Sequence, residues 1–500
     1  MIKRVLIANR GEIALRVIRA CRELGIESVA VFSDADRHAP HVLAADRAEH
    51  IGGSPAPESY LNIPALLDAA RRSGADAVHP GYGFLSERAH FARACVDAGL
   101  IFVGPGAEAI ERMGSKIGAR QLMQQAGVPV VPGETPADQS DAALTASVSN
   151  IGFPALIKPS AGGGGIGMKT VRTQGEVLAA VQSARREAQA AFGDGTLYVE
   201  RLVERPRHVE IQVFADRHGQ VVHLFERECS IQRRHQKALE ESPCPVLAPV
   251  VRQRMGDAAV AAARAAGYVN AGTIEFLLAG EGVDAQFFFL EMNTRLQVEH
   301  PVTEAVVGVD LVRAQLLVAS GKPLPWSQES LSQRGHAIEC RIYAEDPTAG
   351  FLPQAGRLLM YRAPEGPGIR VDAGVVEGSE VSVFYDPLLA KLIVSAETRA
   401  TAIERAVAAL RQYVVLGIRT NIPFLLAILQ HPRFVAGEID TSFLDAEGQA
   451  LRETIGSEDM PMAGFAAAAA HLDDQRRDRG APPAPAAADP FDTIGTWGVR

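Results

Sequence analysis

The chain has 500 residues, of which 47% are hydrophobic and 22% are charged. This length exceeds what a single hydrophobic core normally supports, so we expect about two to four domains. The formal net charge of −9 argues against a general nucleic-acid-binding protein, because such proteins usually carry a basic excess.

The cysteines and the N-terminus indicate where the protein resides. The five cysteines are widely spaced and form no Cys-x-x-Cys pair: Cys21, Cys95, Cys229, Cys244 and Cys340. This usage is typical of a reduced intracellular protein without a disulfide framework or a structural zinc site. The apolar run near Met1 is shorter than a signal peptide requires, and no stretch approaches the length of a membrane span. We therefore expect a cytoplasmic protein that binds neither membrane nor nucleic acid.

The first part of the chain alternates short apolar runs with helical patterns. The runs that predict strands are 5–8, 29–32, 77–79 and 101–103. After the first run, a helical spacing begins at Ile13 and ends at Gly25. Strand–helix alternation of this kind predicts a parallel, doubly wound sheet of the Rossmann-like class over residues 1–113.

The texture of the sequence changes after this region. Residues 114–130 have a helical pattern, and about 131–203 a glycine cluster between strand-like runs predicts a small, mobile α+β domain. Residues 204–446 mix helical patterns with β-rich runs. Residues 447–500 are rich in alanine and then proline, which favours a linker or tail over a packed element.

The segment from Lys158 to Lys169 contains a run of glycines at 162–165 followed by Gly167. Glycine lets the backbone approach a phosphate chain closely and direct several N–H groups at it. The run leads into a strand pattern, unlike a dinucleotide-binding loop, and its lysine precedes the glycines, unlike a Walker A loop. We interpret it as a strand–loop–strand flap over a triphosphate; a flexible linker is the alternative interpretation.

A second segment runs from Glu291 to His300 and follows an apolar strand pattern. Polar and apolar residues alternate along it, and in extended backbone this period of two places every second side chain on one face. The side chains on that face are Glu291, Asn293, Arg295, Gln297 and Glu299. Such a face beside a buried strand costs free energy unless it binds something, which favours a site over a solvated surface.

Glu275 lies in another apparent strand, which a loop rich in glycine and aspartate joins to the strand before Glu291. If the two strands form an antiparallel hairpin centred near Val283, Glu275 lies opposite Glu291. Two carboxylates at this place would suit Mg²⁺ that bridges nucleotide phosphates.

Three other segments offer cationic or polar donors to an anion. They are Gly114-Ser115-Lys116, Arg207-His208-Val-Glu, and Gln232 through Lys237. Taken singly, each is more simply explained as surface charge or as a hydrogen-bonded histidine.

Together these motifs resemble those of biotin carboxylases, the ATP-grasp subunits or domains of acyl-CoA, pyruvate and urea carboxylases. The matching strings are Ile7 through Ala14, His79 through Glu87, Gly114 through Lys116, Lys158 through Gly167, Gln232 through Lys237, Glu291 through Pro301, and Glu339 through Asp346. The resemblance covers about residues 1–446. It implies a Rossmann-like N-terminal domain at 1–113, an ATP-grasp domain at 114–330 with a mobile lid at about 131–203, a C-terminal biotin carboxylase domain at 331–446, and a tail at 447–500.

The resemblance also implies roles for individual residues. ATP would be bound by Lys116, Lys158, Gly163, Gly164, Gly165, Glu200, Leu202, His208, Gln232 and His235. The metal, Mg²⁺ or Mn²⁺, would be held by Glu275, Glu291 and Asn293. Bicarbonate would be held by Lys237, Arg295, Gln297 and Val298. Glu299 would act as general base on bicarbonate, Arg341 would stabilise the enolate of biotin, and Tyr82 would lie near its ureido ring.

The activity implied by the resemblance is the ATP- and bicarbonate-dependent carboxylation of biotin N1′ through carboxyphosphate, the first half-reaction of an acyl-CoA carboxylase. Biotin would be carried by a separate carrier protein or domain, since no Ala-Met-Lys-Met motif occurs in the sequence. The implied partners are that carrier, a second copy of the chain and a carboxyltransferase subunit. The dimer contact would lie at the helix that carries Arg16, Arg19 and Glu23, and we expect this helix to expose these charges on one side. Two alternatives stay open: another ATP-grasp ligase, such as a carboxylate–amine ligase, and an inactive ATP-binding scaffold.

Overall fold

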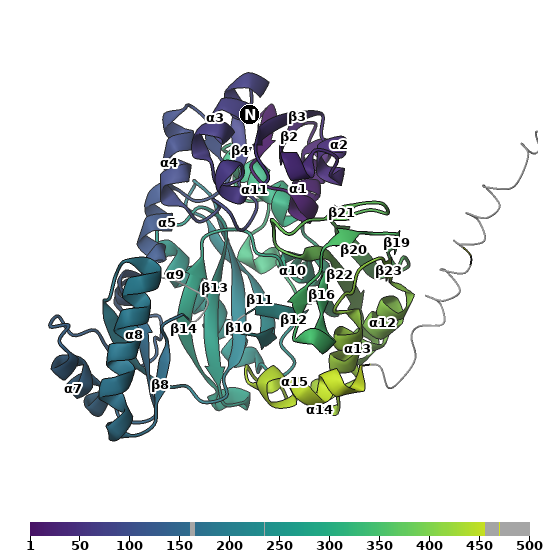
Figure 1. The fold of residues 1–500 in the computed structure, drawn as a ribbon. Helices are drawn as coiled ribbons and strands as arrows, with labels where there is room; N and C mark the ends of the chain where they lie inside the picture. Colours follow the sequence, from purple (N-terminus) through teal and green to yellow (C-terminus); the bar gives the residue numbers. More distant parts are fainter. Residues whose placement is uncertain (161–165, 235, 456–469, 471–500) are drawn as a thin grey trace, which may run out of the picture. The chain divides into compact units, whose positions relative to one another are not determined.

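The strand–helix alternation near the N-terminus produces a five-stranded sheet in the computed structural model (Figure 1). Its strands are β1 (Arg4–Ile7), β2 (Glu27–Ser33), β3 (Arg47–Gly52), β4 (Ala77–His79) and β5 (Ile101–Phe102). They pair in parallel in the order β3-β2-β1-β4-β5. The helices of this region are α1 (Gly11–Glu23), α2 (Pro40–Ala44), α3 (Ile63–Ser73), α4 (Ala89–Asp97) and α5 (Ala107–Gly114).

The alternating side chains of β1 explain why helices cover both faces of this sheet. Val5 and Ile7 belong to a hydrophobic cluster with residues of α1, whereas Leu6 belongs to a second cluster with Leu66 of α3 and Phe91 of α4. The predicted parallel, doubly wound sheet is thus confirmed. The prediction omitted β3, whose sequence is mostly polar and only partly buried.

The structure describes residues 1–160, 166–234, 236–455 and 470. Four residues with predicted ATP-binding roles lie outside these ranges, namely Gly163, Gly164, Gly165 and His235. None of the helices within the ranges combines the length and the apolar character that a membrane crossing requires.

Helix α6 (Lys116–Gln125) forms the predicted bridge and leads to the region predicted as the lid. This region contains a four-stranded antiparallel sheet in the order β6-β9-β7-β8. Its elements are β6 (Gly133–Glu134), α7 (Asp141–Ile151), β7 (Ala155–Pro159), β8 (Lys169–Val171), α8 (Val177–Phe192) and β9 (Leu197–Arg201). The sheet and both helices share their own hydrophobic cluster, as the prediction of a small α+β unit requires. The predicted strands on either side of the glycine run pair with each other, with Ala155 opposite Val171. The mobility of this unit stays a prediction.

The largest sheet of the described residues follows along the chain and has eight strands, in the order β14-β13-β10-β11-β12-β15-β22-β20 (Figure 1). Its strands are β10 (Arg207–Ala215), β11 (Val221–Arg233), β12 (Gln236–Ser242), β13 (Asn270–Ala279), β14 (Gln286–Asn293), β15 (His336–Tyr343), β20 (Ile369–Ala373) and β22 (Leu388–Ala396). The pairing of β12 with β15 carries the sheet across the predicted domain boundary at 330/331. The associated helices are α9 (Pro249–Ala265), α10 (His300–Val307) and α11 (Leu311–Ala319).

The two faces of this sheet differ in chemistry. Along β10, Val209, Ile211 and Val213 pack into a hydrophobic cluster with residues of α9. The alternate residues, among them His208 and Glu210, therefore lie on the opposite face, and they are buried as well. A buried polar face of this kind is where a site is expected.

The C-terminal part contains short strands and four helices around a separate hydrophobic cluster. Its remaining strands are β16 (Glu345–Asp346), β17 (Leu352–Pro353), β18 (Gly356–Arg357), β19 (Met360–Arg362), β21 (Glu380–Val381) and β23 (Val414–Leu416), and its helices are α12 (Arg399–Gln412), α13 (Ile422–Gln430), α14 (Pro432–Val435) and α15 (Phe443–Thr454). Short 3₁₀ turns occur at Asp34–Asp36, Ala56–Glu58, Gln174–Glu176, Gly282–Asp284, Gln328–Ser330 and Pro347–Ala349. The assignment of residues 447–454 to a tail was wrong, because they continue α15 and Leu451 is buried in the cluster.

Candidate active site

The polar face of the large sheet brings together residues from five strands. In the β10–β13 pair Glu210 lies opposite Glu275, and in the β13–β14 hairpin Glu275 lies opposite Glu291. The predicted hairpin register is thus confirmed. Lys237 reaches the same place from β12, and Arg341 reaches it from β15.

The segment from Glu291 to Glu299 converges on this face, but not through the backbone that was predicted. Strand β14 ends at Asn293, and residues 294–299 form a turn that leads into α10. The expectation of one continuous extended face was therefore wrong beyond Asn293. Hydrogen bonds supply the convergence instead: Asn293 Nδ2 and Gln297 Nε2 donate to Glu275 Oε1 at 2.8 and 2.9 Å.

Lys237 is the centre of the cluster. Its Nζ lies 2.6 Å from Glu210 Oε2, 3.0 Å from Glu275 Oε1 and 2.6 Å from Glu299 Oε1. Burial opposes the charge of this ammonium, but the three carboxylates outweigh burial and raise the pKa of Lys237 well above its usual value. Burial likewise opposes the ionised form of Glu275 and Glu299, and Lys237 contributes most to holding the pKa of both well below the usual range.

Arg341 lies on the far side of Glu299 and links it to another acid. Its Nη2 lies 2.9 Å from Glu299 Oε2, and its Nε donates to Glu240 Oε1 at 2.6 Å. Burial raises the pKa of Glu240 to about 7; Arg341 opposes this shift, and the negative charge of Glu299 adds to it. Two carboxylates thus share one guanidinium in a buried place.

The residues predicted for the nucleotide lie around two cations. Lys158 Nζ donates to Glu200 Oε2 at 2.9 Å, and burial of this ammonium is outweighed by Glu200, so its pKa is raised. Lys116, the first residue of α6, has its pKa lowered by burial and by the positive charge of Lys158. The other oxygen of Glu200 accepts from Arg120 at 2.8 Å. Leu202, two residues further along the chain, donates its N–H to the carbonyl of Pro154 at 2.9 Å.

Two further residues predicted for the nucleotide, His208 and Gln232, lie near the Lys237 cluster. His208 Nε2 lies 3.0 Å from Glu275 Oε2, and although burial opposes it, this carboxylate raises the pKa of the imidazole. Gln232 at the end of β11 is the cross-strand neighbour of Lys237. Gln232 thus lies beside Lys237 in the sheet, whereas His208 lies two strands away and shares Glu275 with Lys237.

Arg295 and Tyr82 each contact a carboxylate that lies outside the Lys237 cluster. Arg295 Nε donates to Glu87 Oε2 at 2.9 Å, and its Nη2 donates to Asn293 Oδ1 at 3.2 Å. The Tyr82 hydroxyl donates to Glu12, near the start of α1. Val298, the remaining predicted contact, is half-buried, and its carbonyl accepts from Lys391 at 2.8 Å.

The predicted metal ligands have the chemistry that Mg²⁺ requires. Glu275 and Glu291 are cross-strand neighbours, and desolvation together with repulsion from Glu275 raises the pKa of Glu291. Within the described ranges, the Glu291 carboxylate makes no hydrogen bond. Carboxylate and amide oxygens are the ligands Mg²⁺ takes from proteins, and the excess negative charge favours a cation here. His208, Glu210 and Glu275 also bring ligand atoms within 4.8 Å of one another.

Several residues of the site were not assigned from the sequence. Glu210 binds Lys237, and Glu240 binds Arg341. Arg227 is fully buried and forms hydrogen bonds at the base of the cluster. The partners of Arg227 are Glu210, Gln212, Thr273, Gln297 and Thr303. The alternation of polar and apolar residues along β10 was a usable signal for Glu210, whereas Arg227 has no local signal.

Comparison with known proteins agrees with this geometry. Residues 1–110 match the family model for the N-terminal domain of biotin carboxylase, residues 115–327 that for the ATP-binding domain of the carbamoyl-phosphate synthase L chain, and residues 339–446 that for the C-terminal domain of biotin carboxylase. The chain is 53% identical over 444 residues to a biotin carboxylase of Halalkalibacterium halodurans, covering 89% of this chain and 97% of the relative. It is 50% identical over 445 residues to biotin carboxylase 1 of Bacillus subtilis, covering 89% of this chain and 98% of that relative.

Solved structures give the same result. The biotin carboxylase domain dimer of Hydrogenobacter thermophilus 2-oxoglutarate carboxylase, in complex with MgADP, ADP and bicarbonate, superimposes with a TM-score of 0.86 at 45% identity, covering 90% of this chain and 99% of that chain. The biotin carboxylase of Campylobacter jejuni in a β,γ-ATP complex also has a TM-score of 0.86 at 45% identity, covering 89% and 99%.

The parallel N-terminal sheet, the four-stranded unit and the carboxylate–lysine cluster on the large sheet define an ATP-grasp ligase. The chain belongs to the biotin carboxylase family, and its activity is the ATP-dependent carboxylation of biotin. The predictions of family, fold class and activity are confirmed. The biotin carboxylase matches on both sides of the ATP-binding domain favour this family over a different ATP-grasp ligase.

Proposed function

We propose that this chain carboxylates carrier-bound biotin in two steps, with bicarbonate and MgATP as the other substrates. The observation that carries the proposal is the position of Glu299, held between Lys237 and Arg341. A base flanked by two fixed cations suits a reaction in which an anionic substrate must be bound, deprotonated and used as a nucleophile.

At the nucleotide end, Lys116, Lys158 and His208 would bind the phosphates, and Glu200 and Leu202 would lie along the adenine. Gln232 would contribute to the same pocket, and Gly163, Gly164, Gly165 and His235 keep their predicted roles there. Glu275, Glu291 and Asn293 would hold Mg²⁺, which neutralises charge on the transferred phosphoryl group when it is bound. The ion pair of Lys158 with Glu200 keeps this lysine charged for that contact.

At the centre, Lys237, Arg295, Gln297 and Val298 would bind bicarbonate next to Glu299. Glu299 takes the proton of bicarbonate, and the resulting oxyanion attacks the γ-phosphorus. A new O–P bond forms, the bond to ADP breaks, and carboxyphosphate results. Its breakdown yields CO₂ and phosphate.

In the second step, that phosphate removes the proton from biotin N1′, and the nitrogen forms a bond to CO₂. Arg341 would stabilise the enolate oxygen of the ureido ring as negative charge develops there. Tyr82 would lie beside the ring. Because Arg341 already contacts Glu299, the two steps, formation of carboxyphosphate and carboxylation of biotin, would take place on opposite sides of the Glu299 carboxylate.

The proposal predicts ADP release that requires bicarbonate and increases with biotin. Labelled bicarbonate should give carboxybiotin in proportion to ADP. ADP release that is indifferent to bicarbonate, or that responds to ammonia or an amine in its place, would contradict the proposal. If the protein binds its substrates but shows no turnover, the result would support the alternative of an inactive ATP-binding scaffold.

We further propose a biotin carrier and a carboxyltransferase as partners. We also propose that one structural unit contains three functional divisions, at 1–113, 114–330 and 331–446. The acceptor of the carboxyl group lies with the carboxyltransferase. A cytoplasmic location agrees with five buried, unpaired cysteines.

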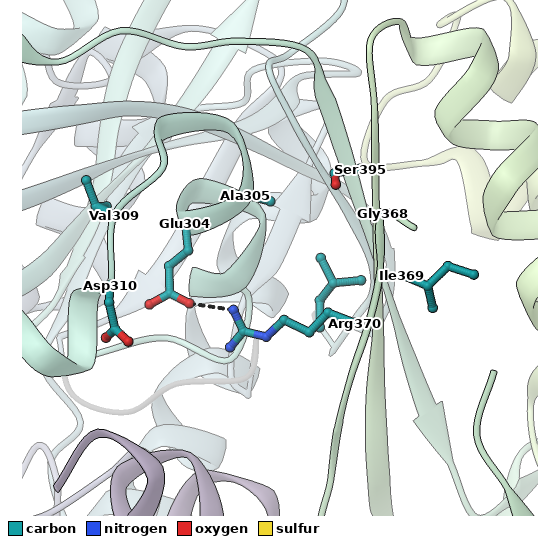
Figure 2. A pocket seen from close by; sticks show the side chains of 9 residues that line it. Glu304, Ala305, Val309, Asp310, Gly368, Ile369, Arg370 and Ser395 are labelled. Atoms are coloured by element: carbon teal, nitrogen blue, oxygen red, sulfur yellow. Dashed lines mark hydrogen bonds and ion pairs between the residues drawn. The ribbon is translucent and has the colours of Figure 1, made fainter. Parts of the chain in front are cut away.

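A homodimer is proposed at α1, with one correction to its contact residues. Arg16 is buried, not exposed as predicted, because its Nη2 bonds Glu304 Oε1 at 2.8 Å and Asp310 Oδ1 at 2.6 Å. Figure 2 shows the pocket at this place, where Arg370 Nη1 also reaches Glu304, at 2.7 Å. Arg19 remains exposed. Sedimentation of wild type and Arg19→Glu should show a dimer that the variant weakens; a wild-type monomer of 53.3 kDa would contradict the proposal.

A further inference from the structure

Lys391 is a fully buried lysine beside the proposed site, and the resemblance assigns it no role. It lies on β22, where its cross-strand neighbours are Arg341 on β15 and Asp372 on β20. The three side chains therefore share the face of the sheet on which the site lies. Helix α10, which follows Glu299, packs against β15 and β22 over this face.

The ammonium of Lys391 contacts two segments that are far apart in the sequence, one at Val298 and one at Glu12. Its Nζ donates to the carbonyl oxygen of Val298 at 2.8 Å, in the turn between Arg295 and Glu299. The same Nζ lies 3.2 Å from Glu12 Oε1, and Glu12 accepts a hydrogen bond from the hydroxyl of Tyr82. One side chain thus connects the turn proposed for bicarbonate with the tyrosine proposed for biotin.

The surroundings keep this ammonium charged. Burial works against the charge, but Glu12, the largest opposing cause, together with Asp372 outweighs it and raises the pKa of Lys391. Asp372 is itself bound by Arg370 at 2.6 Å. Neither carboxyl oxygen of Glu339 has a hydrogen-bond partner among the described residues, and burial raises the pKa of this group well above the usual value. Glu12 is thus the acid in direct contact with Lys391.

We infer that Lys391 is a positioning residue for both half-reactions: it fixes the backbone at Val298 for bicarbonate and, through Glu12, fixes the hydroxyl of Tyr82 for biotin. The inference rests on the proposed roles of Val298 and Tyr82. A buried ammonium suits this task because its contacts with a carbonyl and a carboxylate are strong in a low-dielectric place, and its removal would leave the Val298 carbonyl and Glu12 without their cationic partner.

A purely structural lysine would affect stability alone, so the test must separate the substrates. In Lys391→Met the KM for bicarbonate and the KM for biotin should each rise about 10- to 100-fold, the usual cost of losing a supporting contact behind a ligand-binding group. The KM for ATP should change less than about two-fold, because Lys391 has no hydrogen bond or ion pair with the described residues that are proposed for the nucleotide. Arg399→Met is the matched control: it removes another cation from the same part of the fold, one that binds Glu241 and lies outside the site.

Glu12→Gln separates the two branches and serves if Lys391→Met does not fold. It keeps the size of the side chain and leaves the contact of Lys391 with Val298. The KM for biotin should therefore rise more than the KM for bicarbonate. If both KM values stay at the wild-type level in Lys391→Met, or if Arg399→Met raises them equally, the inference is overturned. If Glu12→Gln raises both equally or neither, the link through Glu12 is overturned. A wild-type enzyme that lacks bicarbonate-dependent ADP release would instead defeat the proposed function.

Discussion

The ammonium of Lys237 lies 2.6 Å from Oε1 of Glu299, the residue proposed as general base. Burial alone would make this carboxyl a stronger base, but Lys237 and Arg341 hold its pKa well below the usual range. Glu299 is therefore ionised at neutral pH and ready to accept a proton, yet it binds that proton weakly. For the proton transfer to proceed, the ammonium of Lys237 has to interact less with Glu299 and more with bicarbonate and the phosphate. The pairing thus links binding of the anions to activation of the base.

Replacement of Glu299 tests this link directly. Glu299→Gln keeps the shape but cannot take a proton, so bicarbonate-dependent ADP release and carboxylation should fall together by about 10²–10⁴-fold. Both products are measured in the same reaction. As the control, binding of ATP should persist; it is measured as the protection that ATP gives the variant against thermal unfolding. Wild-type carboxylation in Glu299→Gln would show that another group is the base.

Arg341→Ser should separate the half-reactions. Because Arg341 is proposed to stabilise the enolate of biotin, carboxylation should fall by about 10²–10³-fold, the usual cost of a lost charge-stabilising donor. Biotin-independent ADP release should fall less. Some loss is expected there too, because Arg341 lies 2.9 Å from Glu299 Oε2. A variant that loses ADP release while carboxylating normally would reverse the assignment.

The shared guanidinium of Arg341 gives a prediction on stability. In the folded chain the pKa of Glu240 is raised to about 7 from the usual 4.5. A raised pKa means that the folded state holds a proton which the unfolded state has lost, so this group lowers stability as pH rises from 4.5 to 7. Glu240→Gln cannot titrate. Its melting temperature relative to wild type should therefore increase between about pH 5 and pH 8, by an amount equivalent to at most roughly 3 kcal/mol. A difference that stays constant over this range would show that Glu240 is ionised throughout.

Local patterns in the sequence were sufficient for much of the fold and part of the site. Strand–helix alternation predicted the parallel sheet, and the glycine–aspartate loop between two apolar strands predicted the register that sets Glu275 opposite Glu291. Both depend on residues close together in the chain. The roles of Glu299 and Arg341 came from the resemblance, since no local pattern relates two residues that lie this far apart in the chain.

The remaining features depend on contacts between distant segments. Lys391 meets Glu12 although the two lie near opposite ends of the described chain, and no periodicity reports such a contact. The extended pattern after Asn293 misled because side-chain hydrogen bonds to Glu275 fold the backbone into a turn. Arg16 looked exposed on its helix, but acids from α10 and the start of α11 bury it. In each case tertiary packing overrode a local signal.

The last prediction concerns the metal. Glu275 binds Lys237 and His208, so its replacement would leave both buried cations short of a partner and confuse binding with folding. Glu291 makes no hydrogen bond within the described ranges, and repulsion from Glu275 contributes to its raised pKa. Glu291→Gln should therefore leave the melting temperature equal to or above that of wild type without metal. The Mg²⁺ concentration for half-maximal ADP release should rise about 10-fold or more, since one of two charged ligands is lost. Titration of activity with Mg²⁺ at saturating ATP measures this, and Mn²⁺, which binds such ligands more tightly, should restore part of the activity. An unchanged Mg²⁺ dependence would place the ion on other residues, such as His208 and Glu210.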